Sequence, residues 1–177
     1  MLSVIRNQYL SFKENRALVF LGSVVALYLV WEFLYRTWFI SSAISAGLCE
    51  ILGLTSGFLF SLSGHEVEYA NRFLSLNSHK VLYIGSSCNG MEFFGLFACF
   101  VIAFPGAIKS KLWFLPAGIL FIHLINVIRV QFLVINYYFF ESSFDFNHKY
   151  TFNFVVYGCT LLIWLWWARK QIQSHAA

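Results

Sequence analysis

The sequence predicts an all-α fold: a polytopic bundle of about four transmembrane helices, with both termini in the cytoplasm. Hydrophobic residues make up 59% of the chain and charged residues only 11%. A soluble domain carries about 25% charged residues, so this chain could not cover a surface that faces water. Apolar stretches of about 20 residues, the length that crosses a bilayer, also recur along the sequence. The 177 residues suit one integral membrane domain, 1–177.

Four stretches are predicted to cross the bilayer, and each is bounded by polar or basic residues. In chain order they cover about 17–40, 90–108, 112–140 and 150–167. Tyr and Trp cluster near several of their ends, as expected for rings that lie at the membrane–water interfaces.

The basic residues predict the orientation, because cytoplasmic segments carry an excess of Lys and Arg. Seven of the 12 Lys and Arg residues flank the predicted spans at the N-terminus, between the second and third spans, and at the C-terminus: Arg6, Lys13, Arg16, Lys109, Lys111, Arg169 and Lys170. Four crossings place all three regions in the cytoplasm. The basic residues form no run that could follow a phosphate backbone, so nucleic acid is not an expected partner.

Residues 41–85 are then expected outside the cell or at the outer interface of the cytoplasmic (inner) membrane. The part 43–62 is moderately apolar, but Glu50 and several Gly and Ser residues interrupt it. This pattern favours an interfacial or re-entrant helix over a further span. Residues 81–84 are expected to form a short extended piece before the turn at 86–88.

Cys88, Arg129 and His148 are each predicted near the outer end of a different span, where ionisable groups are costly and usually functional. Cys88 opens the second span, and the free N–H groups at a helix start favour a thiolate. Arg129 follows His123 and Asn126 at intervals of three, which predicts one polar stripe facing the bundle interior. His148 lies just before the fourth span.

A thiol, an imidazole and a guanidinium at one membrane depth fit nucleophilic acyl transfer. Cys88 would attack a peptide carbonyl, His148 would transfer protons, and Arg129 would stabilise the thiolate or the oxyanion. Taken singly, each residue has a plainer interpretation. A free Cys is usually a small buried hydrophobe, an Arg near an interface is often an anchor, and a loop His is usually solvated.

Three further residues are candidates for supporting or substrate-binding roles. Asn89 follows the thiol directly and, with Gly90, keeps the backbone beside it uncluttered. Glu92 lies one helical turn after Cys88 and could orient His148 or pair with Arg129, although an ion pair that only joins two helices explains it equally well. Asn126, one turn before Arg129, could bind substrate or fix a neighbouring helix.

The order and spacing of these residues resemble the exosortase/archaeosortase family. The sequence Cys88-Asn89-Gly90 opens one span, Asn126 and Arg129 lie near the end of the next, and a His precedes the following one. The resemblance covers residues about 80 to 165. Two departures are Asn89, where the family often has Ser, and a chain shorter than the larger members.

The resemblance implies an intramembrane cysteine protease or transpeptidase with Cys88 as nucleophile and Arg129 and His148 as its catalytic partners. It implies substrates of one class: surface proteins with a C-terminal motif, a transmembrane helix and a basic cluster. The enzyme would act in protein sorting, with its active site facing outward or to the periplasm, and no cofactor is expected.

Other interpretations stay open. In a non-enzymatic assembly or secretion subunit, Cys88 would be incidental and the polar stripe would join helices. In a thiol-redox protein, Cys88 would pair with Cys49. A metallohydrolase built on His65, Glu66, Glu68 and His79 matches no familiar ligand spacing, so no metal site is expected.

Overall fold

Helices dominate the structure, which confirms the all-α prediction. The computed structural model describes residues 2–174 and, within them, the side chains of residues 15–140 and 142–173. The longer helices are α1 (Leu2–Leu34), α2 (Ala43–Leu62), α3 (Met91–Ala103), α4 (Ile108–Phe139) and α6 (Phe152–Ser174). Short helical pieces join them at Tyr35–Phe39, Ser86–Cys88, Glu141–Ser143, α5 (Phe144–Phe146) and Asn147–Thr151.

Among the described residues, four helices are long and apolar enough to cross a membrane. They are Asn15–Phe39, Ala43–Leu62, Ile108–Phe139 and Phe144–Gln173. The number agrees with the sequence prediction, but the set differs, because α2 meets the criteria and α3 does not. At about 1.5 Å per residue, the 13 residues of α3 extend about 20 Å, short of the roughly 30 Å hydrocarbon core.

The second predicted span, 90–108, is therefore helical over only part of its length. Pro105 explains the early end, because the residue before a proline is pushed out of the helical region. Phe104 has φ −66° and ψ 131°, an extended conformation that stops α3 at Ala103.

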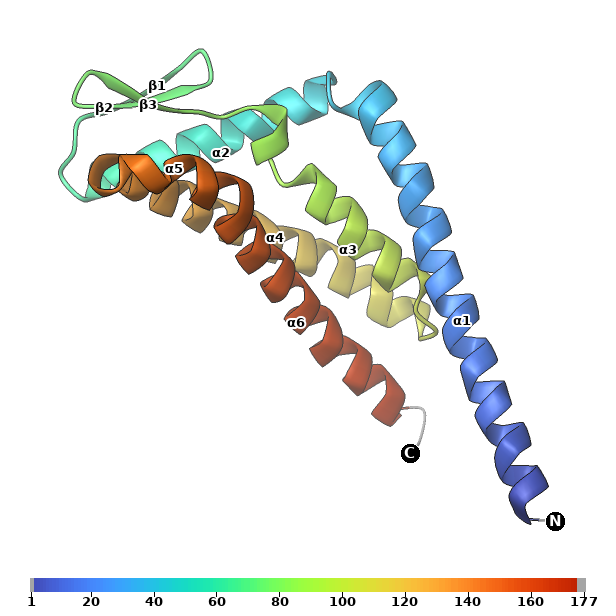
Figure 1. The fold of residues 1–177 in the computed structure, drawn as a ribbon. Helices are drawn as coiled ribbons and strands as arrows, with labels where there is room; N and C mark the ends of the chain where they lie inside the picture. The colour runs from blue at the N-terminus through green and yellow to red at the C-terminus, as the bar shows by residue number, and fades with distance from the viewer. Residues whose placement is uncertain (1, 175–177) are drawn as a thin grey trace.

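Figure 1 shows α2 leaving the end of α1 at a wide angle and passing beneath the small sheet. An interfacial or re-entrant position for residues 43–62 stays a prediction.

A three-stranded antiparallel sheet follows α2 in the order β1 (Val67–Ala70), β2 (Phe73–Leu76) and β3 (His79–Tyr83). The sequence reading expected only the extended piece at 81–84. Both hairpins turn on two residues with positive φ, Asn71–Arg72 and Asn77–Ser78. Such turns match the twist of paired strands, and Asn is among the residues that adopt them most readily.

The sheet is fastened to α2 through Tyr69. Its ring lies where a side chain at Gly53 would be, and its hydroxyl donates a hydrogen bond to the Cys49 carbonyl oxygen at 3.2 Å. Burial, and then the nearby Glu50 carboxylate, raise the pKa of Tyr69 to about 12, so the hydroxyl keeps its proton at neutral pH. Gly53, one of the glycines that interrupt the apolar pattern of α2, thus makes room for the Tyr69 ring.

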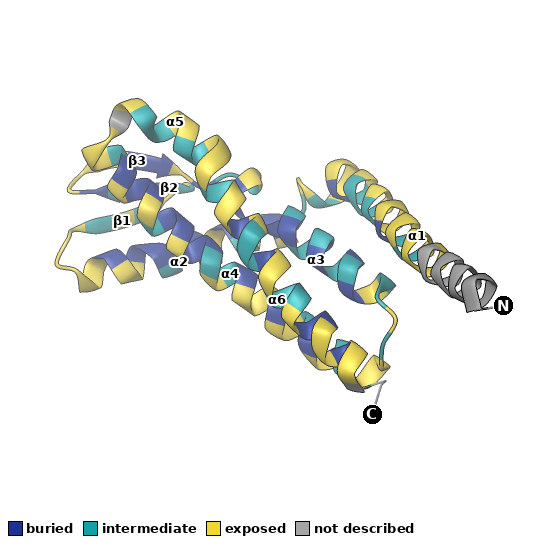
Figure 2. Cartoon of the chain, turned by 60° about the horizontal axis from the view of Figure 1, so that its bottom comes forward, coloured by how far each residue is buried: buried dark blue, intermediate teal, exposed yellow. Residues whose placement is uncertain are grey.

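The remaining packing forms two buried clusters. One lies beneath the sheet, between α2 and α4, and includes Leu52, Leu74 and Val130. The other joins α3, α4 and α6 through aromatic rings, with Phe114 stacked on Trp167 at 4.8 Å between ring centres. Figure 2 shows the buried residues concentrated in these elements, whereas α1 is exposed along most of its described length.

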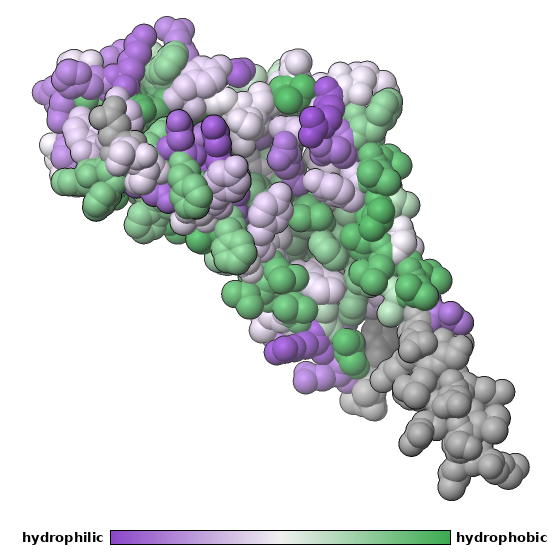
Figure 3. Space-filling model, viewed as in Figure 1, coloured by the Kyte–Doolittle hydropathy of each residue, from purple (hydrophilic) through white to green (hydrophobic). Residues whose placement is uncertain are grey.

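The surface divides by polarity along the bundle. Figure 3 shows hydrophilic residues over the end that carries the sheet, hydrophobic residues along the middle, and hydrophilic residues again near the C-terminal end of α6. An apolar belt between two polar ends is the surface expected of a protein that crosses a bilayer.

Candidate active site

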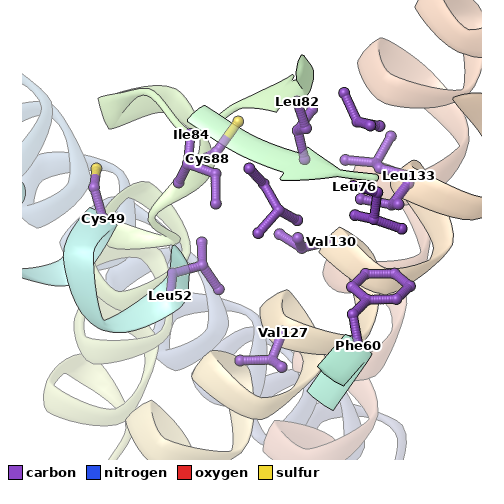
Figure 4. Close-up of a cluster of buried hydrophobic side chains, with 13 residues drawn as sticks. Cys49, Leu52, Phe60, Leu76, Leu82, Ile84, Cys88, Val127, Val130 and Leu133 are labelled. Carbon is purple, nitrogen blue, oxygen red and sulfur yellow. The ribbon is translucent and has the colours of Figure 1, made fainter. Parts of the chain in front are cut away.

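The thiol of Cys88 lies at the junction between the sheet and α3. Cys88 ends the short helix Ser86–Cys88, and its backbone N–H donates to the Gly85 carbonyl oxygen at 2.9 Å. Only 6% of the residue is exposed. Figure 4 shows Cys88 close to Ile84 and Leu82, within the cluster beneath the sheet. The helix α3 begins three residues later, so the thiol precedes the helix start instead of forming it.

His148 lies against Cys88. Its Nε2 atom is 3.5 Å from the Cys88 Sγ, within hydrogen-bonding range for sulfur. The residue belongs to the π-helical turn Asn147–Thr151 and is half-buried. Its ring stacks on Phe144, with 5.8 Å between ring centres and 21° between planes. Single π turns inside helices often occur at functional sites.

Arg129 completes the group from α4. The residue is 5% exposed, and its Nη2 donates to the His148 carbonyl oxygen at 3.5 Å. Its Nε and Nη1 are buried and have no hydrogen-bond partner among the described residues. A buried guanidinium with two free donors is costly unless an anion or a carbonyl group meets it. Two groups that could carry negative charge, the Cys88 thiol and the Glu92 carboxyl, act on it electrostatically.

Asn89 fixes the backbone beside the thiol. Its Nδ2 donates to Ser45 Oγ at 2.8 Å, and its Oδ1 accepts from the Met91 N–H at 3.0 Å. The side chain is almost fully buried. It therefore ties the start of α3 to α2, which is a supporting position and leaves no free group for a substrate.

Asn126 is fully buried against Gly90. Neither its Oδ1 nor its Nδ2 has a hydrogen-bond partner within the described chain. Gly90 has φ +81°, and a Cβ there would overlap the Asn126 amide. The amide thus approaches the backbone two residues after the thiol with its hydrogen-bonding capacity unused.

Glu92 is the candidate that the structure does not join to the others. It is half-buried on α3 and forms neither an ion pair nor a hydrogen bond with any described residue. The sequence suggests two partners for it, Arg129 and His148, and Glu92 forms no ion pair or hydrogen bond with either, although its charge acts on Arg129. Of the predicted polar stripe, Asn126 and Arg129 are buried in the interior and His123 is half-buried.

Two residues of this site escaped the sequence reading. Phe144 holds the imidazole by stacking, and Ser45 anchors Asn89. No sequence signal distinguishes Phe144 among 21 phenylalanines, nor a serine 44 positions away from the residue it binds.

The alternative chemistries find less support in the geometry. Cys49 and Cys88 are free thiols, and Figure 4 shows their sulfur atoms clearly separated. No three His, Cys, Asp or Glu side chains come together as a metal site in the part of the chain that the structure describes. The contacts around Cys88 are those of a buried thiol with a proton acceptor and a cation beside it, which suits attack on a carbonyl carbon.

Comparison with known proteins agrees with this geometry at the level of family. The family model described as transmembrane exosortase (Exosortase_EpsH) matches residues 33–166. The match begins near the end of α1 and extends into the last turns of α6, so it contains Cys88, Arg129 and His148. No curated protein and no solved structure matches the chain.

Proposed function

The chain belongs to the transmembrane exosortase family, and from that premise we propose that it is a cysteine transpeptidase or protease that cleaves C-terminal sorting signals of surface proteins. The observation that carries the proposal is the 3.5 Å contact between Cys88 Sγ and His148 Nε2, beside the unpartnered donors of Arg129. The reaction would take place at the outer face of the cytoplasmic membrane.

In the first step His148 accepts the Cys88 proton, and the sulfur attacks the scissile carbonyl carbon. The contact in the structure joins the two atoms that this proton transfer needs. The carbonyl π electrons move to oxygen, and the resulting oxyanion needs a donor that is already in place. Arg129 has free, buried donors at Nε and Nη1, and either of them would supply such an N–H.

In the second step the oxyanion collapses and the C–N bond breaks. The imidazolium of His148 returns the proton to the leaving amine, which departs with the membrane-anchored part of the signal. The product is a thioester between Cys88 and the surface protein. An amine or hydroxyl acceptor, or water, then attacks the thioester with His148 again as base, and the thiol is regenerated.

A trapping experiment tests this proposal. Wild-type protein and the Cys88→Ala variant are expressed in membranes with a reporter that ends in a recognition motif, a transmembrane helix and a basic cluster. We expect cleavage by the wild type and a thioester adduct on Cys88 by mass spectrometry, and neither in Cys88→Ala.

Cys99→Ala is the matched control. Cys99 is, like Cys88, a free thiol with 6% exposure, but it lies on α3 and has no contact with His148 among those described. It should cleave the reporter like the wild type. Equal cleavage by Cys88→Ala would show that Cys88 is not the nucleophile, and cleavage that does not depend on the presence of the chain would favour the non-enzymatic subunit.

A further inference from the structure

Two apolar cavities open between α4 and α6, which run side by side through the bundle (Figures 1 and 2). One, of about 270 Å³, lies beside Arg129 and is bounded by Ile128, Phe132 and Val155. The other, of about 340 Å³, lies nearer the start of α4 and is bounded by Phe121, Leu162 and Trp166. Phe132 and Leu162 are 54% and 66% exposed, so both cavities open onto the outside of the bundle.

The two cavities lie along the same two helix faces, one on α4 and one on α6. Their α4 residues recur at helical intervals of three, four or seven and so share one face of α4: Phe114, Phe121, Ile125, Ile128 and Phe132. The α6 residues do the same: Phe152, Val156, Ile163 and Trp166. We call this surface the α4/α6 groove. From Phe114 to Phe132 it extends about 27 Å at 1.5 Å per residue, close to the thickness of the hydrocarbon core.

One end of the α4/α6 groove reaches the candidate active site. Arg129 lines the cavity at that end, and its Nη2 contacts the backbone of His148, whose ring contacts Cys88. The Nε and Nη1 of Arg129 have no partner among the described residues. An occupant of the groove would therefore be apolar along its length and would end beside the buried guanidinium of Arg129.

We propose that the α4/α6 groove holds the transmembrane helix of the substrate, and that the scissile segment reaches Cys88 past Arg129 from the lipid side. This inference rests on the proposed function. A single apolar helix matches the groove in length and polarity. The peptide that precedes such a helix is extended, so its carbonyl oxygens are free to accept from the guanidinium. The small, exposed side chain of Ala117 lines the groove and allows close approach between helices.

Photocrosslinking tests the position of the substrate helix. A photoreactive amino acid is placed at Phe121 in the groove or at Ile119, which lies on another face of α4 at nearly the same depth and has similar exposure, 36% against 39%. Both are made in the Cys88→Ala background, so that the reporter described above is not consumed. We expect the reporter to crosslink at position 121 and not at 119.

Parallel cleavage by the wild type separates the two proposals. A reporter that is cleaved but crosslinks at 119, or at neither position, overturns the groove and leaves the enzyme intact. A crosslink between two copies of the chain at 121 also overturns it. A reporter that crosslinks at 121 without any Cys88 adduct supports the groove and counts against the cysteine mechanism.

A second variant gives a kinetic readout. Ala117→Trp fills the groove with a ring, and Ile119→Trp places the same ring outside it. Because the obstruction acts on binding and lies away from the reacting atoms, we expect Ala117→Trp to raise KM roughly tenfold with little change in kcat. Equal KM values in the two variants would contradict the proposal.

Discussion

Gly90 links the thiol to α3 through a conformation that side chains seldom adopt. Its φ of +81° costs an L-residue about 1–2 kcal/mol, and a Cβ would also overlap the buried amide of Asn126. The position therefore requires glycine for two independent reasons. Both concern the backbone immediately after the proposed nucleophile.

We predict that Gly90→Ala lowers the unfolding temperature and reduces reporter cleavage. Gly158→Ala is the control, since a Cβ at Gly158 meets nothing within 4 Å. Thermal unfolding in detergent and the cleavage assay measure the two effects. The double variant Gly90→Ala/Asn126→Ala should recover part of the loss, because it removes the overlap and keeps the strained φ. No recovery would mean that backbone strain alone makes the glycine necessary.

Arg129 is proposed to stabilise the oxyanion through its fork of donors. Lys at this position would keep a positive charge but lose the planar guanidinium, which holds its N–H donors in fixed directions. We predict that Arg129→Lys lowers kcat by about 10²–10³-fold, the usual effect of removing an oxyanion donor, with a smaller change in KM. Single-turnover cleavage of the reporter measures the change in the rate of the chemical step. A kcat equal to the wild type would show that the charge alone suffices.

At the scale of the elements, the sheet depends on the absence of side chains on one face of α2. The Tyr69 ring occupies the space next to Gly53, and Val67 and Leu74 come close to Gly57. Gly47, on the same helix, is exposed and has nothing within 4 Å. Gly53 is thus required for docking, whereas a Cβ at Gly57 would make only ordinary contacts and Gly47 has no contact that requires it.

We predict opposite outcomes for two chemically identical changes on α2. Gly47→Ala should raise stability by up to about 1 kcal/mol, because alanine favours a helix over glycine. Gly53→Ala should lower stability, because Tyr69 must leave its place and lose its bond to the Cys49 carbonyl. Thermal unfolding in detergent shows whether each variant is more or less stable than the wild type. Faster cleavage by trypsin at Arg72 would locate the loss in the sheet, and equal rates in both variants would contradict the docking role.

At the scale of the whole molecule, the position of α2 decides which face of the membrane carries the sheet. If α2 lies at the interface and α3 with its flanking residues crosses, the sheet and the proposed active site face outward and the start of α4 is cytoplasmic. If α2 crosses instead, the sheet and the start of α4 lie on the same side. The length of α2 permits either arrangement.

We predict the first arrangement, from the basic residues that flank the spans. Single cysteines are introduced at Ser78 in a hairpin turn and at Lys109 at the start of α4, in a chain without its four native thiols. A maleimide that cannot cross membranes should label Ser78→Cys in intact cells and Lys109→Cys only after permeabilisation. Labelling of both, or of neither, in intact cells would place the sheet and the start of α4 on one side.

The sequence alone determined the class of fold and the chemistry of the candidate residues. Composition excludes a water-facing surface, and a backbone in lipid must satisfy its hydrogen bonds internally, so apolar stretches of this length become helices. The positions of Cys88, Arg129 and His148 near the ends of the predicted spans can likewise be read from the sequence, because each depends only on the residues around it. The early end of α3 is also encoded locally, by Pro105, although the span predicted from the sequence continues to residue 108.

Only the tertiary structure decided which of these residues meet. The contact between Cys88 and His148 joins positions 60 residues apart, and Asn89 reaches Ser45 across 44. Glu92 lies one turn from the thiol in sequence and yet forms no ion pair or hydrogen bond with either predicted partner. The reason is that spacing along a helix fixes a residue's face but not the neighbour it meets. That neighbour depends on how close two helices approach, which for α3 and α4 is set by Gly90 and Gly118.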